Sequence, residues 1–176
     1  FKELGQLDDA IRSYEKAVTL KPDHANAYNN LGNTLSDLGQ LDAAVKSYKK
    51  ALAVKPDYAE AHNNLGATLR KLDQLDDAIK CYEKAVALKP DYAEAYNNLG
   101  KALNELGQHN DAIKCYKKAL SLVPDFAEAY RNLGNVMLGL KRLDEALASY
   151  ESAIALNPDL DFILGDYLHT KMHLGI

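Results

Sequence analysis

The sequence predicts an all-α fold, a solenoid of stacked antiparallel helix pairs, and three observations support this prediction. Prolines recur every 34 residues, at Pro22, Pro56, Pro90, Pro124 and Pro158. Small and large residues occupy fixed places between these prolines. Residues that favour helix starts recur twice in each interval. A repeat of this length cannot bury its apolar face alone, so neighbouring repeats must stack on one another.

The proline spacing divides the chain into repeats, with each proline at position 32 of its repeat. The first segment, 1–24, is expected to hold the end of a first helix and a complete second helix. The whole repeats are 25–58, 59–92, 93–126 and 127–160. Residues 161–176 begin a further repeat in which Leu168 replaces the glycine of position 8, so we expect a capping or junction helix there. Because the pattern is already under way at Phe1, we expect the sequence to be a piece of a longer protein.

Each repeat shows the start signals of two helices. Asp57 and Glu60 have the spacing of a capping box at the start of a first helix. The second helices are expected to begin at cap residues, which are Asp42, Asp76, Asn110 and Asp144. Gly39 and Gly107 suit the turn between the two helices. Asp73 and Lys141 stand in the same place in the other repeats and are less favourable there.

The helices of a pair are expected to pack closely through a small and a large residue. Position 8 is glycine and position 24 is tyrosine, as in Gly100 and Tyr116, and positions 20 and 27 are alanine. A small residue lets two helix backbones approach, and the aromatic ring fills the space beside it. We therefore expect Gly100→Leu to overpack the contact and to destabilise the fold severely.

These residues together resemble the tetratricopeptide repeat. The resemblance rests on the run Ala-Tyr-x-Asn-Leu-Gly followed by alanine at positions 20 and 27, tyrosine at 24 and proline at 32, and it covers nearly the whole chain. Position 4 is often tryptophan in that family. Here it is tyrosine or histidine, and we expect His62 to be a packed substitute for the tryptophan. The resemblance implies a right-handed superhelix whose curvature leaves a groove for a partner polypeptide.

One side of each first helix is rich in asparagine, and in the family this side lines the concave surface. On a helical wheel, positions 2, 5, 6, 9, 12 and 13 lie opposite the apolar positions. The candidate peptide-binding residues are Asn30, Asn64, Asn98 and Asn132 at position 6, Asn29, Asn63, Asn97 and Arg131 at position 5, and Asn33 and Lys101 at position 9. Asparagine costs a helix interior roughly half a kcal/mol relative to alanine, so its repeated use at one register suggests a further role.

A primary amide offers both donors and acceptors, which match the N–H and C=O groups of a peptide backbone. With repeats roughly 10 Å apart, one asparagine would meet about every third residue of an extended strand. The alternative is that these amides bridge adjacent repeats or cap carbonyl groups inside the protein. Lys101 and Arg131 could attract acidic side chains of a partner or simply form a solvated helix face. A clamp for a C-terminal carboxylate, used by some family members, is not expected because position 5 is asparagine.

The segment Asn157–Leu174 is similar to the exit from the repeats in bacterial relatives of O-linked N-acetylglucosamine transferases. In that family an asparagine ladder holds the acceptor polypeptide ahead of a two-lobed catalytic domain. Here Gly175 and Ile176 replace the usual Cys-Asp-Trp continuation. The expected function is therefore a polypeptide-binding scaffold that recognises acceptors for a glycosyltransferase domain absent from these residues. The alternative is a general assembly scaffold unrelated to glycosyl transfer.

Several other classes of function are not expected. The net charge of −4 is spread over mixed residues, without the basic face of a nucleic-acid binder. The sequence lacks the ~18 consecutive apolar residues of a membrane span. It also lacks a glycine-rich phosphate loop or a catalytic constellation, so we expect neither enzymatic activity nor a cofactor in this fragment. His169 and His173 could share a helix face, but two ligands do not make a structural zinc site, and no metal is expected.

The two cysteines, Cys81 and Cys115, lie one repeat apart. Equivalent positions in stacked helix pairs are roughly 8–10 Å apart, which exceeds disulfide reach. Free thiols and a reducing, cytoplasmic location are expected. Terminal repeats that expose an apolar face also favour self-association.

Overall fold

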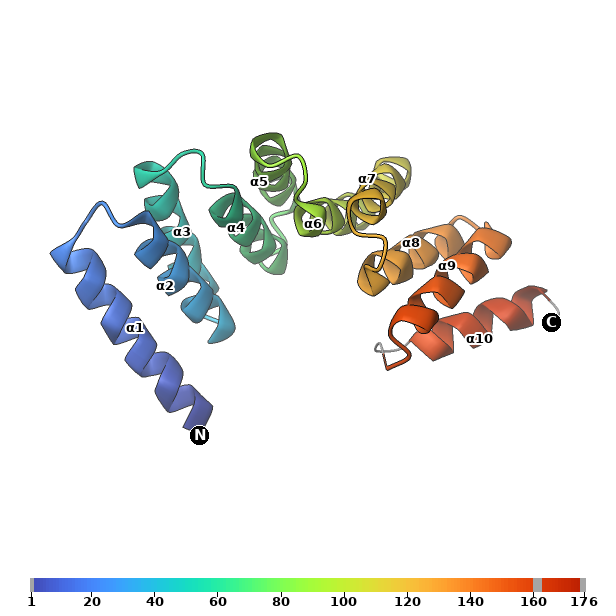
Figure 1. Ribbon diagram of the computed structural model, residues 1–176, viewed down its shortest axis with the longest axis horizontal. Coiled ribbons are helices and arrows are strands. Elements are labelled where there is room, and N and C mark those ends of the chain that lie inside the picture. Colours follow the sequence, from blue (N-terminus) through green and yellow to red (C-terminus); the bar gives the residue numbers. More distant parts are fainter. Residues whose placement is uncertain (1, 160–162, 175–176) are drawn as a thin grey trace. The chain divides into compact units, whose positions relative to one another are not determined.

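The computed structural model describes residues 2–159 and 163–174, and all regular structure within them is helical (Figure 1). This confirms the predicted all-α class. The helices are α1 Lys2–Leu20, α2 Ala25–Asp37, α3 Leu41–Val54, α4 Ala59–Lys71, α5 Leu75–Leu88, α6 Ala93–Glu105, α7 His109–Leu122, α8 Ala127–Gly139, α9 Leu143–Leu156 and α10 Ile163–Leu174. The chain forms two compact units, an N-terminal unit, Phe1–Pro90, and a C-terminal unit, Asp91–Ile176.

Both units are built from helix pairs joined by tight turns. In the N-terminal unit, α2 pairs with α3 and α4 pairs with α5, while α1 packs on α2 and α3 packs on α4. In the C-terminal unit, α6 pairs with α7 and α8 pairs with α9, α7 packs on α8, and α10 packs mainly on α9. The first helices also touch within each unit, α2 with α4 and α6 with α8. Their adjacent surfaces form the candidate site.

The turn within each whole repeat places one residue in the left-handed region. The φ angles are 73° at Gly39, 60° at Asp73, 81° at Gly107 and 59° at Lys141. Two of these positions hold glycine, as expected, because glycine reaches this conformation without a Cβ clash. Aspartate visits the region more readily than most residues, whereas lysine at Lys141 carries the full strain of roughly 1–2 kcal/mol.

The helix starts differ from the prediction. The first helices α4, α6 and α8 follow Tyr58, Tyr92 and Phe126, and none of these residues provides a side-chain cap. The backbone N–H of Tyr58 donates to the Lys55 carbonyl at 3.3 Å. This turn moves the helix start one residue beyond Asp57, so the predicted capping box is wrong. Glu60 instead pairs with Lys89, with 3.0 Å between Oε1 and Nζ.

The second helices also begin earlier than predicted. They follow Gln40, Gln74, Gln108 and Arg142, again without side-chain caps. Asp42 and Asp76 consequently lie in the first turn rather than at the cap. A carboxylate there still interacts favourably with the positive end of the helix dipole, which explains the aspartates without a capping role.

The first segment differs as well. We expected 1–24 to contain the end of one helix and a second helix, but α1 is one continuous helix, Lys2–Leu20. Backbone hydrogen bonding continues past Gly5, through the place where the whole repeats reverse direction.

The close packing of glycine on tyrosine is confirmed in both units. A Cβ built on Gly32 would lie 2.5 Å from Cε1 of Tyr48, and one built on Gly134 would lie 2.6 Å from Cε1 of Tyr150. These rings are 2% and 0% exposed. The alanines at positions 20 and 27 of the whole repeats are all fully buried. The pairs therefore close over a small–large contact that leaves no room for an added methyl group.

Candidate functional site

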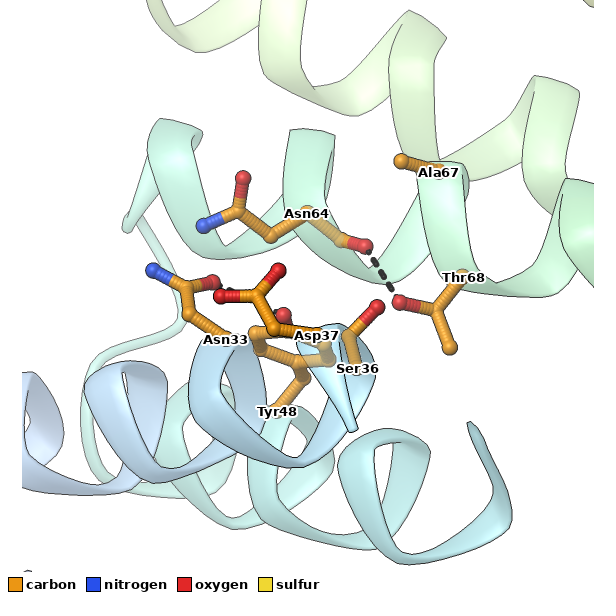
Figure 2. A pocket seen from close by; sticks show the side chains of 7 residues that line it. All are labelled: Asn33, Ser36, Asp37, Tyr48, Asn64, Ala67 and Thr68. Carbon is orange, nitrogen blue, oxygen red and sulfur yellow. Dashed lines mark hydrogen bonds between the residues drawn. The ribbon is translucent and has the colours of Figure 1, made fainter. Parts of the chain in front are cut away.

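A polar notch lies between the first helices of the N-terminal unit (Figure 2). Its volume is about 320 Å³. The lining residues are Asn33, Ser36 and Asp37 from α2, Asn64, Ala67 and Thr68 from α4, and Tyr48 from α3. We call this feature the α2–α4 notch. Helical spacing explains it, because residues three and four apart share one face of each helix.

Hydrogen bonds define the floor of the notch. The Tyr48 hydroxyl donates to Asn33 Oδ1 at 2.7 Å, and the Thr68 hydroxyl donates to the backbone carbonyl of Asn64 at 3.0 Å. Burial raises the pKa of Tyr48 to about 12; a hydrogen bond with Thr68 opposes the shift, and the charge of Asp37 adds to it. Tyr48 therefore remains a protonated donor, and its bond to Oδ1 orients the Asn33 amide so that the Asn33 N–H groups face away from the ring.

The asparagines of adjacent first helices are linked to each other. Asn64 Nδ2 donates to Asn29 Oδ1 at 3.1 Å in the N-terminal unit, and Asn132 Nδ2 donates to Asn97 Oδ1 at 3.0 Å in the C-terminal unit. In each case the amide at position 6 reaches back to position 5 of the preceding repeat. These bonds match the alternative considered from the sequence, in which the amides bridge adjacent repeats.

Position 5 lies in the protein interior and not on an open groove. Asn29 is 5% exposed, and Asn63 and Asn97 are each 1% exposed. The helical wheel placed them on the polar side of the helix, but the structure uses that part of the surface for packing. These three side chains therefore offer little surface to a bound polypeptide. Arg131 at the same position is half-buried.

Position 6 varies along the chain. Asn30 is exposed, Asn64 and Asn98 are half-buried, and Asn132 is only 8% exposed. Asn132 therefore bridges adjacent first helices and offers little surface to a ligand. The exposed and half-buried amides remain candidates, and Asn64 also lines the α2–α4 notch.

Position 9 contains two of the expected residues in different roles. Asn33 is half-buried, lines the notch and accepts from Tyr48. Lys101 is half-buried and forms an ion pair with Glu128, which compensates its charge within the C-terminal unit. The expectation that Lys101 attracts acidic partners is weakened by this pair. Asn135 repeats the arrangement of Asn33, since its Oδ1 accepts from the Tyr150 hydroxyl at 2.8 Å.

The sequence reasoning missed Asp37 as a site residue. Asp37 is the last residue of α2, is exposed, and lines the notch. A helix C-terminus carries partial negative charge and favours cations. A carboxylate at that end, with no basic residue in the last turn of α2, was the signal that could have identified it.

The His, Cys, Asp and Glu side chains of the described residues are dispersed. No group of three or more His, Cys, Asp or Glu side chains is placed to hold a metal ion within the described part of the chain. His169 lies on α10, and the side chain of His173 lies outside the described residues. His62 is half-buried, and its Nε2 lies 2.9 Å from the carbonyl oxygen of Pro56, which is a structural contact.

The two cysteines are free thiols, each half-buried. Burial raises the pKa of the Cys81 thiol to about 11. At neutral pH this thiol is protonated and a poor nucleophile. None of the helices in the described residues has the length and apolar character needed to span a membrane.

Comparisons with known proteins identify the repeats. The tetratricopeptide repeat family matches over residues 57–125 and 91–159, and a TPR repeat profile matches over 1–39 and 32–73. No curated protein gives a significant match.

Several solved structures are similar to the chain. A crystal structure of MamA is 32% identical, with a TM-score of 0.81 over 89% of this chain and 92% of that one. YrrB, described as a TPR protein with an unusual peptide-binding site, is 26% identical with a TM-score of 0.77 over 97% and 86%. TTC0263, a thermophilic TPR protein of Thermus thermophilus, is 26% identical with a TM-score of 0.76 over 97% and 93%. These similarities confirm the predicted class of helix-pair solenoid.

Proposed function

The chain belongs to the tetratricopeptide repeat family, and we propose that it is an interaction scaffold whose first helices bind an extended segment of a partner protein. The fold supports the general part of this proposal, since repeats of this kind present side chains from successive first helices on one surface. The similar protein YrrB is described as having a peptide-binding site. The proposal for this chain depends on its own polar side chains.

The observation that carries the proposal is the hydrogen-bonding capacity of the α2 and α4 surface. Asn64 uses one amide N–H for Asn29, so its second N–H and its carbonyl oxygen can serve a ligand. Asn33 accepts from Tyr48 through Oδ1, which leaves its N–H groups as donors for a ligand. Asn30 is exposed on the same helix as Asn33. An extended peptide presents matching donors and acceptors on every residue.

Mutation of the exposed and notch asparagines tests the proposal. An array of unstructured peptides, each about three repeat spacings long, would provide a binding sequence, and fluorescence polarisation would measure its affinity for the wild-type chain. We expect Asn30→Ala and Asn64→Ala each to weaken binding about fivefold, the effect of losing a hydrogen bond of about 1 kcal/mol. Asn110→Ala, an exposed change on α7, is the matched control. Unchanged affinity in both test variants would refute the peptide ladder.

A check of folding must accompany Asn64→Ala. This change leaves the buried Oδ1 of Asn29 without its donor, which costs roughly 1–3 kcal/mol of stability. Asn30→Ala removes no side-chain bond of this kind and is the cleaner variant. Far-UV circular dichroism melts of both proteins separate a loss of binding from a loss of fold.

Two narrower functions are compatible with this scaffold. One is recognition of acceptor polypeptides for an O-linked N-acetylglucosamine transferase-like enzyme, as the segment Asn157–Leu174 suggested; the other is general assembly of protein complexes. Both would use the same first-helix surface, and the fold and the comparisons are equally consistent with each. A two-lobed transferase domain encoded after residue 176 in the parent gene supports the first, and its absence supports the second. A cytoplasmic location and a non-catalytic role for these residues belong to the same proposal.

A further inference from the structure

We infer that the α2–α4 notch binds a basic side chain, arginine or lysine, of the partner polypeptide, with Asp37 as its counter-ion. The inference rests on the proposed peptide binding and specifies one residue of the partner. It follows from the acceptors in the notch, from the position of Asp37 on its helix, and from the contrast with the matching surface of the C-terminal unit.

The notch is rich in acceptors. The Asp37 carboxylate is the one formal charge among the lining residues, and Asn64 and Ser36, whose side chains carry acceptor oxygens, belong to the same lining (Figure 2). An ionised carboxylate accepts hydrogen bonds and donates none. Guanidinium and ammonium groups donate several and accept none. A volume of about 320 Å³ is at the small end of ligand pockets, which suits one long side chain rather than a folded domain.

The charge of Asp37 is opposite in sign to the charge that stabilises a helix C-terminus. The C-terminal carbonyl groups of a helix carry roughly half a negative charge, and an adjacent carboxylate is unfavourable by about 0.3–1 kcal/mol. The equivalent residue one repeat on is Lys71, and α4 ends with Arg70 and Lys71. Asp37 and the carbonyl groups at the end of α2 together attract a cation, and Asp37 forms no ion pair with any described residue.

Lys71 is a cation whose side chain reaches a residue of the notch lining. Its Nζ lies 3.4 Å from Ser36 Oγ, on the rim, and Lys71 is exposed. This long contact with a neutral hydroxyl leaves Asp37 without a direct counter-ion. A ligand cation would therefore not need to break an existing ion pair.

The matching surface of the C-terminal unit already contains a cation. Lys101 takes the place of Asn33, and it pairs with Glu128 across α6 and α8. The side chains of this pair are 22% and 37% exposed. The ammonium group of Lys101 thus occupies, in the C-terminal unit, the position that Asn33 has in the N-terminal unit. We therefore predict a preference for a basic side chain of the partner in the N-terminal unit alone.

Titration with paired probes tests the inference. The small probes are N-acetyl-arginine amide and N-acetyl-citrulline amide, which differ in charge but little in shape. The larger probe is a short Ser/Ala peptide with arginine, citrulline or glutamate at its centre. Two-dimensional ¹⁵N NMR follows the side-chain amides of Asn33 and Asn64. We expect the arginine probes to shift these signals and to bind about tenfold more tightly than the citrulline probes, as a charge-assisted hydrogen bond would produce.

Variants of the protein test whether the preference for arginine over citrulline depends on Asp37. Asp37→Asn should bring the arginine-to-citrulline ratio close to one, and Asp37→Lys should make the glutamate peptide the tightest of the three. Asp57→Asn removes an exposed carboxylate outside the notch, and Glu105→Gln removes the carboxylate at the equivalent position of the C-terminal unit. Both should keep the wild-type ratio. Lys71→Gln should leave the ratio unchanged or raise it.

Three outcomes would overturn the inference. If arginine and citrulline peptides bind equally well and Asn30→Ala still weakens peptide binding, the proposed function stands and the inferred site for a basic side chain is rejected. Arginine preference that persists in Asp37→Asn would place the basic site elsewhere. Absence of binding by every peptide, together with unshifted Asn33 and Asn64 signals in both small-probe titrations, would reject the inference and the extended-peptide function together.

Discussion

The contact between Gly100 of α6 and Tyr116 of α7 allows a sharp test of the helix-pair packing. Glycine in a helix interior lowers stability by about 0.5–1 kcal/mol relative to alanine. If there were free space beside Gly100, Gly100→Ala would therefore stabilise the protein. At this site a Cβ would lie 2.7 Å from Cε1, 2.9 Å from Cδ1 and 2.9 Å from Cζ of the Tyr116 ring. All three distances are shorter than ordinary van der Waals contacts between carbons.

The loss of stability expected for Gly100→Ala depends on whether the Tyr116 ring or the two helices can move. The Tyr116 ring is 1% exposed, so it cannot swing into solvent, and the helices must separate or the ring must leave its rotamer. Overpacking of this kind costs about 1–3 kcal/mol. After subtraction of the gain in helix propensity, we expect Gly100→Ala to lower the free energy of unfolding by about 1–2 kcal/mol. The larger side chain of Gly100→Leu should cost more.

Urea unfolding followed by far-UV circular dichroism measures this effect. Gly139→Ala is the matched control, since Gly139 ends α8 with nothing within 4 Å of an added Cβ; it should be neutral or stabilising. Tyr116→Leu should remove most of the penalty when it is combined with Gly100→Ala, which gives a double-mutant cycle. A Gly100→Ala protein as stable as the Gly139→Ala control would refute the packing argument and the repeat register on which it depends.

Three other perturbations have definite expected outcomes. Lys141→Gly should stabilise the C-terminal unit by about 1 kcal/mol, because it relieves the left-handed strain at φ 59°, and urea unfolding will show whether it does. Asp37→Asn should raise the free energy of unfolding by about 0.3–1 kcal/mol while it weakens arginine binding; a loss of stability would contradict the assignment of Asp37 to binding. Burial raises the pKa of Tyr48 from 10.0 to about 12. Between pH 10 and pH 12 the unfolded chain releases the Tyr48 proton and the folded chain keeps it. The free energy of unfolding is therefore unaffected by this group below pH 10 and falls as the pH rises toward 12. A pH series of melts should show this loss, and Tyr48→Phe should reduce it after allowance for the lost bond to Asn33.

The difference between predicted and observed helix starts shows where local sequence signals are insufficient. Asp57 and Glu60 have the spacing of a capping box, but the turn from Lys55 to Tyr58 places the start of α4 after Tyr58. Capping patterns are one of several local preferences, and this loop has a backbone hydrogen bond from Tyr58 to Lys55 while α4 begins without a side-chain cap. The helical type and the two helices of each whole repeat were predictable from periodicity, whereas the terminal residues and the single helix of the first segment were not.

The candidate site illustrates the same limit at the level of function. The helical wheel correctly separated apolar from polar positions, but it could not distinguish a polar surface that faces solvent from one that faces the next helix. Asn29 and Asn97 appeared equivalent to Asn30 on the wheel, yet they are buried acceptors for amides of the following repeat. Asp37, at position 13, lies on the polar side of the wheel, but the wheel does not distinguish it from the other polar positions of that side.

The sequence by itself determined the 34-residue period, the pairing of helices within each repeat, and the glycine and tyrosine that pack together, because each of these depends on the spacing of residues along one chain. Only the tertiary structure decided which asparagines bridge neighbouring helices, which remain open to a ligand, and that Asp37, Asn64 and Ser36 line one notch. The physical reason is that exposure and hydrogen-bond partners depend on the distance and rotation between helices from different repeats. These quantities are set by packing and are not encoded in the periodicity of a single helix.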